Sequence, residues 1–215
     1  MLDTVIFDLD GTLLDTLEDL YLSVNHILSK YNFPLRTIDE VRMFVGNGVP
    51  KLIERALPKG HSKEAFDSAL ADFKKYYGAH CNDNTKPYFA ITESLEILKE
   101  RGYKIAVVSN KVDFATKSLC SDYFGDLVDV AIGQREGIEK KPAPDSVFEA
   151  MKILNSKNAV YIGDSDVDIM TAKNANLPCI AVTWGFRDKD FLSSSGAEIF
   201  AHDANEMIDL IIEKM

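Results

Sequence analysis

Several features are scarce in this sequence of 215 residues, and each shortage excludes a class of protein. Its three cysteines, Cys81, Cys120 and Cys179, are odd in number and widely spaced, so we expect a reduced, cytoplasmic protein without a disulfide framework. No apolar run approaches the roughly 20 residues that a membrane-spanning helix needs. No secretion signal is recognisable near the first residue, so neither an exported nor a membrane protein is expected.

Positive charge is scarce as well. Lysine and arginine total 24 against 34 aspartates and glutamates, which gives a formal net charge of −10 at pH 7. A general nucleic-acid-binding protein presents a basic face to the phosphate backbone, so this function is not expected. A small anionic substrate remains compatible with the sequence, because it responds to local charge rather than to net charge.

Two kinds of pattern divide the chain. A short apolar run at residues 4–7 predicts a strand, and from residue 15 to residue 82 apolar residues recur at helical spacing. Beyond residue 83, strands expected at residues 104–109, 127–132, 159–162, 179–182 and 198–200 alternate with helices. Such alternation is typical of a Rossmann-like open parallel sheet. We therefore predict an α/β core made of residues 1–14 and 83–215, interrupted by an all-helical insertion at residues 15–82.

Polar side chains follow the predicted strands at the ends where open α/β sheets bind ligands. Asp8 and Asp10 follow the first strand, where residues two apart share a side and can face the same group. The others are Ser109 and Asn110 after the second strand, Lys141 before a helix, and Asp164, Asp166 and Asp168 after the strand at residues 159–162. Close carboxylates cannot all stay ionised without a cation, and Mg²⁺ suits such oxygen ligands best.

Structural roles compete with functional ones at several of these positions. Asp8 and Asp10 could form an ordinary turn, and we assign Asp166 to capping the following helix rather than to a metal. Lys141 is preferred to its neighbour Lys140 because it directly precedes Pro142, as in the family pattern described next. Thr37 and Glu40 have the spacing of a capping box, which predicts the start of a helix in the insertion.

Four short motifs occur in a familiar order. DLDGTL, SN, K-P and GDSDVD resemble the four motifs of the haloacid dehalogenase superfamily, and the helical insertion is similar to that family's cap. The segment R-x-x-V-G-N-G at residues 42–48 and VTWGF at residues 182–186 resemble the phosphoglycolate phosphatases. The resemblance covers nearly the whole chain.

The resemblance also implies a role for each candidate residue. Asp8 would be the nucleophile, and Asp10 would protonate the leaving alcohol and then activate water. Mg²⁺ would be held by Asp8, the main-chain carbonyl of Asp10 and Asp164, with Asp168 acting on the water shell of the metal or on Lys141. The residues expected to bind the substrate are Ser109, Asn110, Lys141, Gly11, Thr12 and, in the cap, Arg42.

The expected function is therefore that of a Mg²⁺-dependent phosphomonoesterase with an aspartyl-phosphate intermediate. Its partner would be a small phosphorylated metabolite, with 2-phosphoglycolate as the first choice. Alternatives within the superfamily are a pyrophosphatase, a sugar-phosphate or nucleotide phosphatase and a phosphomutase. The alternative that is not an enzyme is a catalytically silent regulatory module. A dehalogenase is not expected, because Asp10 supplies an acid that a halide leaving group does not need. Both a monomer and a homodimer are compatible with the sequence.

Overall fold

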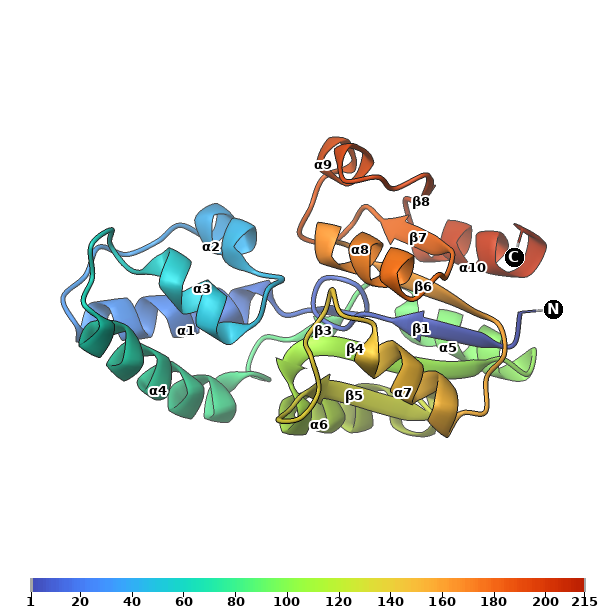
Figure 1. Cartoon of the computed structure of the whole chain (residues 1–215), viewed down its shortest axis with the longest axis horizontal. Coiled ribbons are helices and arrows are strands. Elements are labelled where there is room, and N and C mark those ends of the chain that lie inside the picture. Colours follow the sequence, from blue (N-terminus) through green and yellow to red (C-terminus); the bar gives the residue numbers. More distant parts are fainter. Residues whose placement is uncertain (1, 215) are drawn as a thin grey trace. The chain divides into compact units, whose positions relative to one another are not determined.

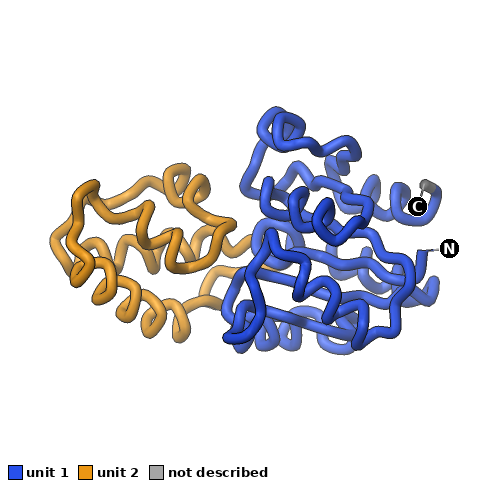
Figure 2. Tube along the Cα trace, in the orientation of Figure 1, with its two compact units in different colours: residues 1–14, 87–215 blue, residues 15–86 orange. Residues whose placement is uncertain are grey.

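The computed structural model describes residues 2–214 and divides into two compact units (Figure 2). The core unit contains the residues up to Leu14 and from Pro87 onward, and the helical unit is Asp15–Lys86. The second connection thus lies at residues 86–87, a few residues beyond the expected boundary at 82–83. At the connections, β2 (Leu14–Asp15) and β3 (Lys86–Pro87) form a two-stranded sheet, which the sequence pattern did not reveal.

A six-stranded sheet forms the centre of the core unit (Figure 1). Its order is β5-β4-β1-β6-β7-β8, and every pair of neighbours is parallel. The strands are β1 (Thr4–Phe7), β4 (Lys104–Val112), β5 (Val130–Gln134), β6 (Ala159–Gly163), β7 (Cys179–Val182) and β8 (Ile199–Ala201). The α/β fold predicted from the sequence is confirmed.

Helices cover both faces of this sheet. Val5 and Phe7 of β1 pack with one set of helices, and Ile6 packs on the opposite face, because successive strand residues point to opposite sides. The first set is α5 (Ile91–Glu100), α6 (Asp113–Phe124) and α10 (Ala204–Lys214), and the second is α7 (Asp145–Ile153) and α8 (Asp166–Asn174). All residues of β1 are buried, which explains why this strand is apolar from Val5 to Phe7.

Three elements of the core unit differ from the expectation. Strand β4 continues to Val112, past the predicted end at residue 109. Strand β5 begins at Val130, later than expected, because residues Gly125–Leu127 form a 3₁₀ turn (η1). Helix α9 (Lys189–Ser194) was missed, since it has six residues and only Leu192 is buried, which leaves no apolar periodicity to detect.

Four helices make up the helical unit. They are α1 (Leu17–Lys30), α2 (Ile38–Phe44), α3 (Val49–Ala56) and α4 (Lys63–His80), and α1 packs against the other three. The predicted capping box at the start of α2 is confirmed: Thr37 Oγ1 accepts from Glu40 N at 3.2 Å, and Glu40 Oε2 accepts from Thr37 N at 2.8 Å. In the part of the chain that the structure describes, no helix has the length and apolarity needed to cross a membrane.

A buried carboxylate joins the two ends of the helical unit. Asp19, in the first turn of α1, accepts hydrogen bonds from Asn84 N at 2.9 Å, Asn84 Nδ2 at 2.9 Å, Thr85 N at 2.9 Å and Thr85 Oγ1 at 2.8 Å. Asp19 is only 2% exposed, so these donors replace the water that its charge would otherwise require. Asp19 therefore fixes residues 84–85 against the start of α1.

We expect Asp19→Ala to lower the free energy of unfolding by about 3 kcal/mol, because four donors lose a charged acceptor and two of them belong to the backbone. Urea unfolding followed by circular dichroism measures the loss. Glu18→Ala is the matched control, since Glu18 is the adjacent acid of the same helix turn and is exposed. Equal losses in the two variants would show that Asp19 is not an anchor.

Candidate active site

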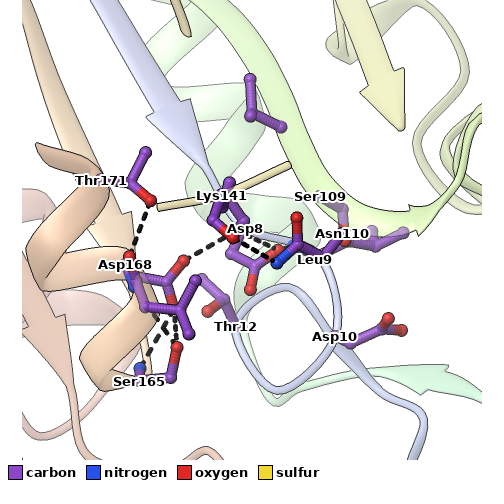
Figure 3. Close-up of polar contacts among 12 residues, drawn as sticks. Asp8, Leu9, Asp10, Thr12, Ser109, Asn110, Lys141, Ser165, Asp168 and Thr171 are labelled. Carbon is purple, nitrogen blue, oxygen red and sulfur yellow. Dashed lines mark hydrogen bonds and ion pairs between the residues drawn. The ribbon is translucent and has the colours of Figure 1, made fainter. Parts of the chain in front are cut away.

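The carboxyl ends of three neighbouring strands bring the candidate residues together (Figure 3). Asp8 follows β1, Ser109 and Asn110 lie in β4 beside it, and Asp164 follows β6 on the other side. All four residues are at most 9% exposed. The register shift between Val108 and Val112 interrupts the pairing of β4 with β5 at the level of Ser109 and Asn110.

Lys141 lies at the centre of the group. Its Nζ is 2.9 Å from Asp8 Oδ1 and 2.8 Å from Asp168 Oδ1, and it donates to the Tyr161 hydroxyl at 2.9 Å. Lys141 is 2% exposed, whereas Lys140 is on the surface. A lysine with this environment is a fixed positive charge at the edge of the sheet rather than a solvated surface group.

Burial controls the ionisation of this cluster. Loss of water, reinforced by the Asp168 carboxylate, raises the pKa of Asp8 to about 7 despite the opposing effect of Lys141. The same loss of water, with Asp168 and Asp8 nearby, raises the pKa of Asp164 well above its usual value. Burial would lower the pKa of Lys141, but Asp168 and Asp8 raise it well above its usual value. Lys141 therefore stays charged, yet one ammonium does not balance three carboxylates.

Asp168 is held by the first turn of α8. Its Oδ2 accepts from Ser165 N at 3.1 Å and from Ser165 Oγ at 2.6 Å, while Oδ1 faces Lys141. Ser165 is the N-cap, so the assignment of Asp166 as the capping residue is wrong by one position. The error arises because Ser and Asp are both good N-caps, and only the capping box with Asp168 distinguishes them.

Gly11 and Thr12 shape the loop that follows β1. Gly11 has φ +86°, and a Cβ at this position would lie 2.4 Å from Asp164 Oδ2, so only glycine fits. Gly11 N donates to Leu14 O at 2.8 Å, Thr12 N to Leu9 O at 3.3 Å and Thr12 Oγ1 to Asp164 Oδ1 at 3.3 Å. These donors are used inside the core unit, and contacts of Gly11 and Thr12 with the substrate stay a prediction.

Asp10 is directed away from Asp8 (Figure 3). Its carboxylate pairs with Lys111, whose Nζ lies 2.9 Å from Asp10 Oδ1 and whose side chain is 3% exposed. The expectation that both aspartates face one side fails because β1 ends at Phe7, so strand alternation does not extend to Asp10. Lys111 was missed, although its place directly after Ser109 and Asn110 was a usable signal.

Ser109, Asn110 and Arg42 have different surroundings. Ser109 Oγ accepts from Lys111 N at 3.2 Å, and a hydroxyl that accepts one bond can still donate another. Asn110 Nδ2 donates to Lys141 O at 3.1 Å and so ties the Lys141 segment to β4. Arg42 belongs to α2 of the helical unit, where its Nη1 lies 3.3 Å from Asp39 Oδ1.

The acidic side chains fit a divalent cation. Among the described residues, Asp8, Asp164 and Asp168 form the one group of acids whose ligand atoms lie within 4.8 Å of one another, and all three are buried. Carboxylate oxygens are the ligands that Mg²⁺ prefers, and the charge imbalance around Lys141 favours an additional cation. The carboxylate of Asp10 is outside this group, so only its main-chain carbonyl could take part.

The sequence profile of the haloacid dehalogenase-like hydrolases matches residues 5–182. The chain belongs to this family. A phosphoglycolate phosphatase of Aquifex aeolicus (strain VF5) is 34% identical to it over 190 residues, which cover 85% of each protein. A phosphoglycolate phosphatase of Rhodobacter capsulatus is 34% identical over 191 residues and 87% of each protein.

Solved structures agree with this assignment. A crystal structure from Lactobacillus delbrueckii subsp. bulgaricus, provisionally assigned as a phosphoglycolate phosphatase, has a TM-score of 0.94. It is 33% identical to this haloacid dehalogenase-like hydrolase, and the match covers 99% of both chains. The family and these relatives make the protein an enzyme of the phosphatase type, so the silent regulatory module is no longer needed as an explanation.

The Lys111–Asp10 pair predicts a coupling in stability. Lys111→Met leaves the Asp10 carboxylate largely buried without its cation, which should cost roughly 3–5 kcal/mol in urea unfolding. Adding Asp10→Asn to Lys111→Met should recover part of this loss, because no uncompensated charge remains. Lys117→Met is the control, since Lys117 pairs with Asp113 but its side chain is 57% exposed, and little change is expected. Strictly additive losses would contradict the coupling.

Proposed function

We propose that this protein is a Mg²⁺-dependent phosphatase that hydrolyses a small phosphate monoester, with 2-phosphoglycolate as the preferred substrate. The observation that carries the proposal is the Lys141 ammonium between Asp8 and Asp168, beside the three-carboxylate group. A nucleophilic carboxylate, a fixed ammonium and ligands for a cation are the groups that phosphoryl transfer requires. 2-Phosphoglycolate is chosen as the substrate because the relatives described above are phosphoglycolate phosphatases.

Asp8 is the proposed nucleophile. An oxygen of its carboxylate attacks phosphorus, the bond from phosphorus to the alcohol oxygen breaks, and Asp10 gives the departing oxygen a proton. In the second step Asp10 takes a proton from water, whose oxygen attacks phosphorus and releases inorganic phosphate. Asp8 is then a free carboxylate again and Asp10 is protonated, so the cycle is balanced.

The remaining groups neutralise and hold the phosphoryl oxygens. Ser109 donates a hydrogen bond from its hydroxyl to a phosphoryl oxygen, and Lys141 supplies positive charge. Asp168 positions Lys141, and Asn110 fixes the main chain beside Lys141. Mg²⁺ would be held by Asp8, Asp164 and the main-chain carbonyl of Asp10, and it would supply further positive charge for the phosphoryl oxygens. In this scheme only Asp8 forms a covalent bond, and the other groups neutralise charge or position a neighbour.

The helical unit is the proposed cap, and Arg42 is its proposed contact with the carboxylate of 2-phosphoglycolate. Arginine suits this task because its planar guanidinium binds a carboxylate through two parallel hydrogen bonds. Arg42 is 43% exposed at its side chain, and a solvent-accessible guanidinium can exchange Asp39 for a substrate. This residue would give the enzyme its preference for an anionic leaving group.

A screen of phosphorylated metabolites tests the proposed function. Phosphate release should be fastest, by kcat/KM, with 2-phosphoglycolate, and excess chelator should abolish it. A higher kcat/KM for pyrophosphate, a sugar phosphate or a nucleotide would replace the substrate but keep the phosphatase. Full activity in excess chelator would remove the cation from the mechanism.

Arg42→Ala adds a test of substrate choice. It should raise KM for 2-phosphoglycolate roughly tenfold or more, because a charge-assisted contact contributes about 1.5–3 kcal/mol. KM for a neutral aryl phosphate should change little. Lys51→Ala is the control, because Lys51 is another exposed cation of the helical unit and is paired with Glu54. Equal changes for both substrates would make Arg42 a structural residue.

Asp8 and Asp10 should fail in different ways when changed. Asp8→Asn should abolish the phosphoryl-enzyme, since no nucleophilic carboxylate remains. Asp10→Asn should slow its formation roughly 10²–10⁴-fold with alkyl phosphates but least with a nitrophenyl phosphate, whose leaving group needs no proton. Rapid-quench measurement of the phosphoryl-enzyme separates the two. If Asp10→Asn slowed good and poor leaving groups equally, proton transfer would not be its role.

A further inference from the structure

The loop after β7, residues Thr183–Arg187, contacts both sides of the candidate cation site. Phe186 N donates to Asp164 Oδ2 at 2.7 Å. Trp184 Nε1 donates to Thr12 O at 3.0 Å, in the loop that carries Asp8 and Asp10. This loop contains most of the VTWGF segment. The segment lies outside the four family motifs, and the proposed mechanism gives it no role.

Gly185 lies between these two contacts and is packed against the site. A Cβ at this position would lie 2.3 Å from Gly11 O, 2.4 Å from Asp164 Cβ and 2.4 Å from Asp164 Oδ2. Contacts that short do not occur, so any side chain would displace either the carboxylate or the loop. Gly185 is not among the glycines with positive φ, so the requirement here is for space and not for an unusual backbone conformation.

Asp164 is thereby oriented from two directions. Its Oδ1 accepts from Thr12 Oγ1 at 3.3 Å, and its Oδ2 accepts from Phe186 N at 2.7 Å. Because Trp184 joins the two loops that supply these donors, a shift of either loop would turn the carboxylate. Hydrogen bonds from outside the ligand set are a general means of fixing the orientation of a metal ligand.

We propose that the Thr183–Arg187 loop is a positioning element for Mg²⁺, with Gly185 and Trp184 as its positioning residues. The inference rests on the proposed function in one respect, the assignment of Asp164 as a ligand of the cation. Gly185 sets the distance of the loop from the Asp164 carboxylate, and Trp184 keeps the loop in register with the Asp8–Thr12 segment. Neither residue touches the reacting atoms.

The test is the affinity for Mg²⁺ of Gly185→Ala, measured by calorimetry on the full chain and by the Mg²⁺ concentration that gives half-maximal activity. Both should weaken roughly 10–100-fold, the usual effect of losing support outside the ligand set. Saturating Mg²⁺ should restore part of kcat. KM for the phosphate ester at saturating Mg²⁺ should change less than the affinity for Mg²⁺.

Two further variants separate positioning from folding. Trp184→Phe keeps an aromatic ring but removes the donor to Thr12 O, so it should weaken Mg²⁺ binding in the same direction and by less. Gly78→Ala is the matched control, because a Cβ at Gly78, in α4, meets no atom within 4 Å. It should leave Mg²⁺ binding unchanged. Circular dichroism and the melting temperature without Mg²⁺ report whether each variant is folded.

Unchanged Mg²⁺ affinity in folded Gly185→Ala, or in folded Trp184→Phe if Gly185→Ala does not fold, would overturn the inference. So would an affinity that falls equally in Gly78→Ala. If the wild-type protein binds Mg²⁺ and the variants bind it as well, only the role of the loop is lost and the proposed function stands. Absence of Mg²⁺ binding by the wild-type protein would overturn both the cation assignment and this inference.

Discussion

An excess of buried negative charge at one edge of a parallel sheet is the constraint on which the active site depends. Asp8, Asp164 and Asp168 lie within reach of a common ligand, and Lys141 provides one opposing charge. Burial raises the pKa of Asp8 to about 7, although the nucleophilic role proposed for Asp8 requires an ionised carboxylate. Additional positive charge resolves this conflict, because a cation favours the ionised carboxylate and also neutralises the phosphoryl oxygens of a substrate. The cluster is thus unfavourable by itself and is suited to a cation and an anionic group that bind together.

The sheet order explains why this charge collects in one place. Strands β4, β1 and β6 are adjacent and parallel, so their carboxyl ends meet, although they are far apart in the sequence. Their central residues are buried and mostly apolar, and the polar candidate residues lie at or just beyond the carboxyl ends of the strands. Ligand binding at this edge is a property of the topology. What the topology does not provide is the orientation of each carboxylate, which comes from the first turn of α8 for Asp168 and from two loops for Asp164.

The sequence predicted the topology of the sheet better than the orientation of the individual side chains. Long periodic or continuously apolar segments predicted the α/β fold, because burial on both faces leaves a strong signal in the sequence. Features set by contacts between distant residues were not predictable. The pairing of Lys111 with Asp10 joins β4 to the loop after β1, and the need for glycine at Gly185 comes from atoms of Gly11 and Asp164. The cap of α8 is a local feature, and Asp166 was chosen over Ser165 because both residue types are good N-caps. A one-dimensional pattern contains the residue types at these positions but not the distances between them.

The two acids of FDLDGTL show how these levels combine. Strand alternation would place Asp8 and Asp10 on one side, yet the strand ends at Phe7 and the chain turns at Gly11, so the two carboxylates diverge. Asp8 is directed into the buried cluster with Lys141, and Asp10 is directed to Lys111. The roles proposed for Asp8 and Asp10 act at different atoms of the substrate, the phosphorus and the leaving oxygen, and divergent carboxylates are compatible with these two roles. The two aspartates thus have different charged neighbours, which are supplied by the segment that precedes α7 for Asp8 and by β4 for Asp10.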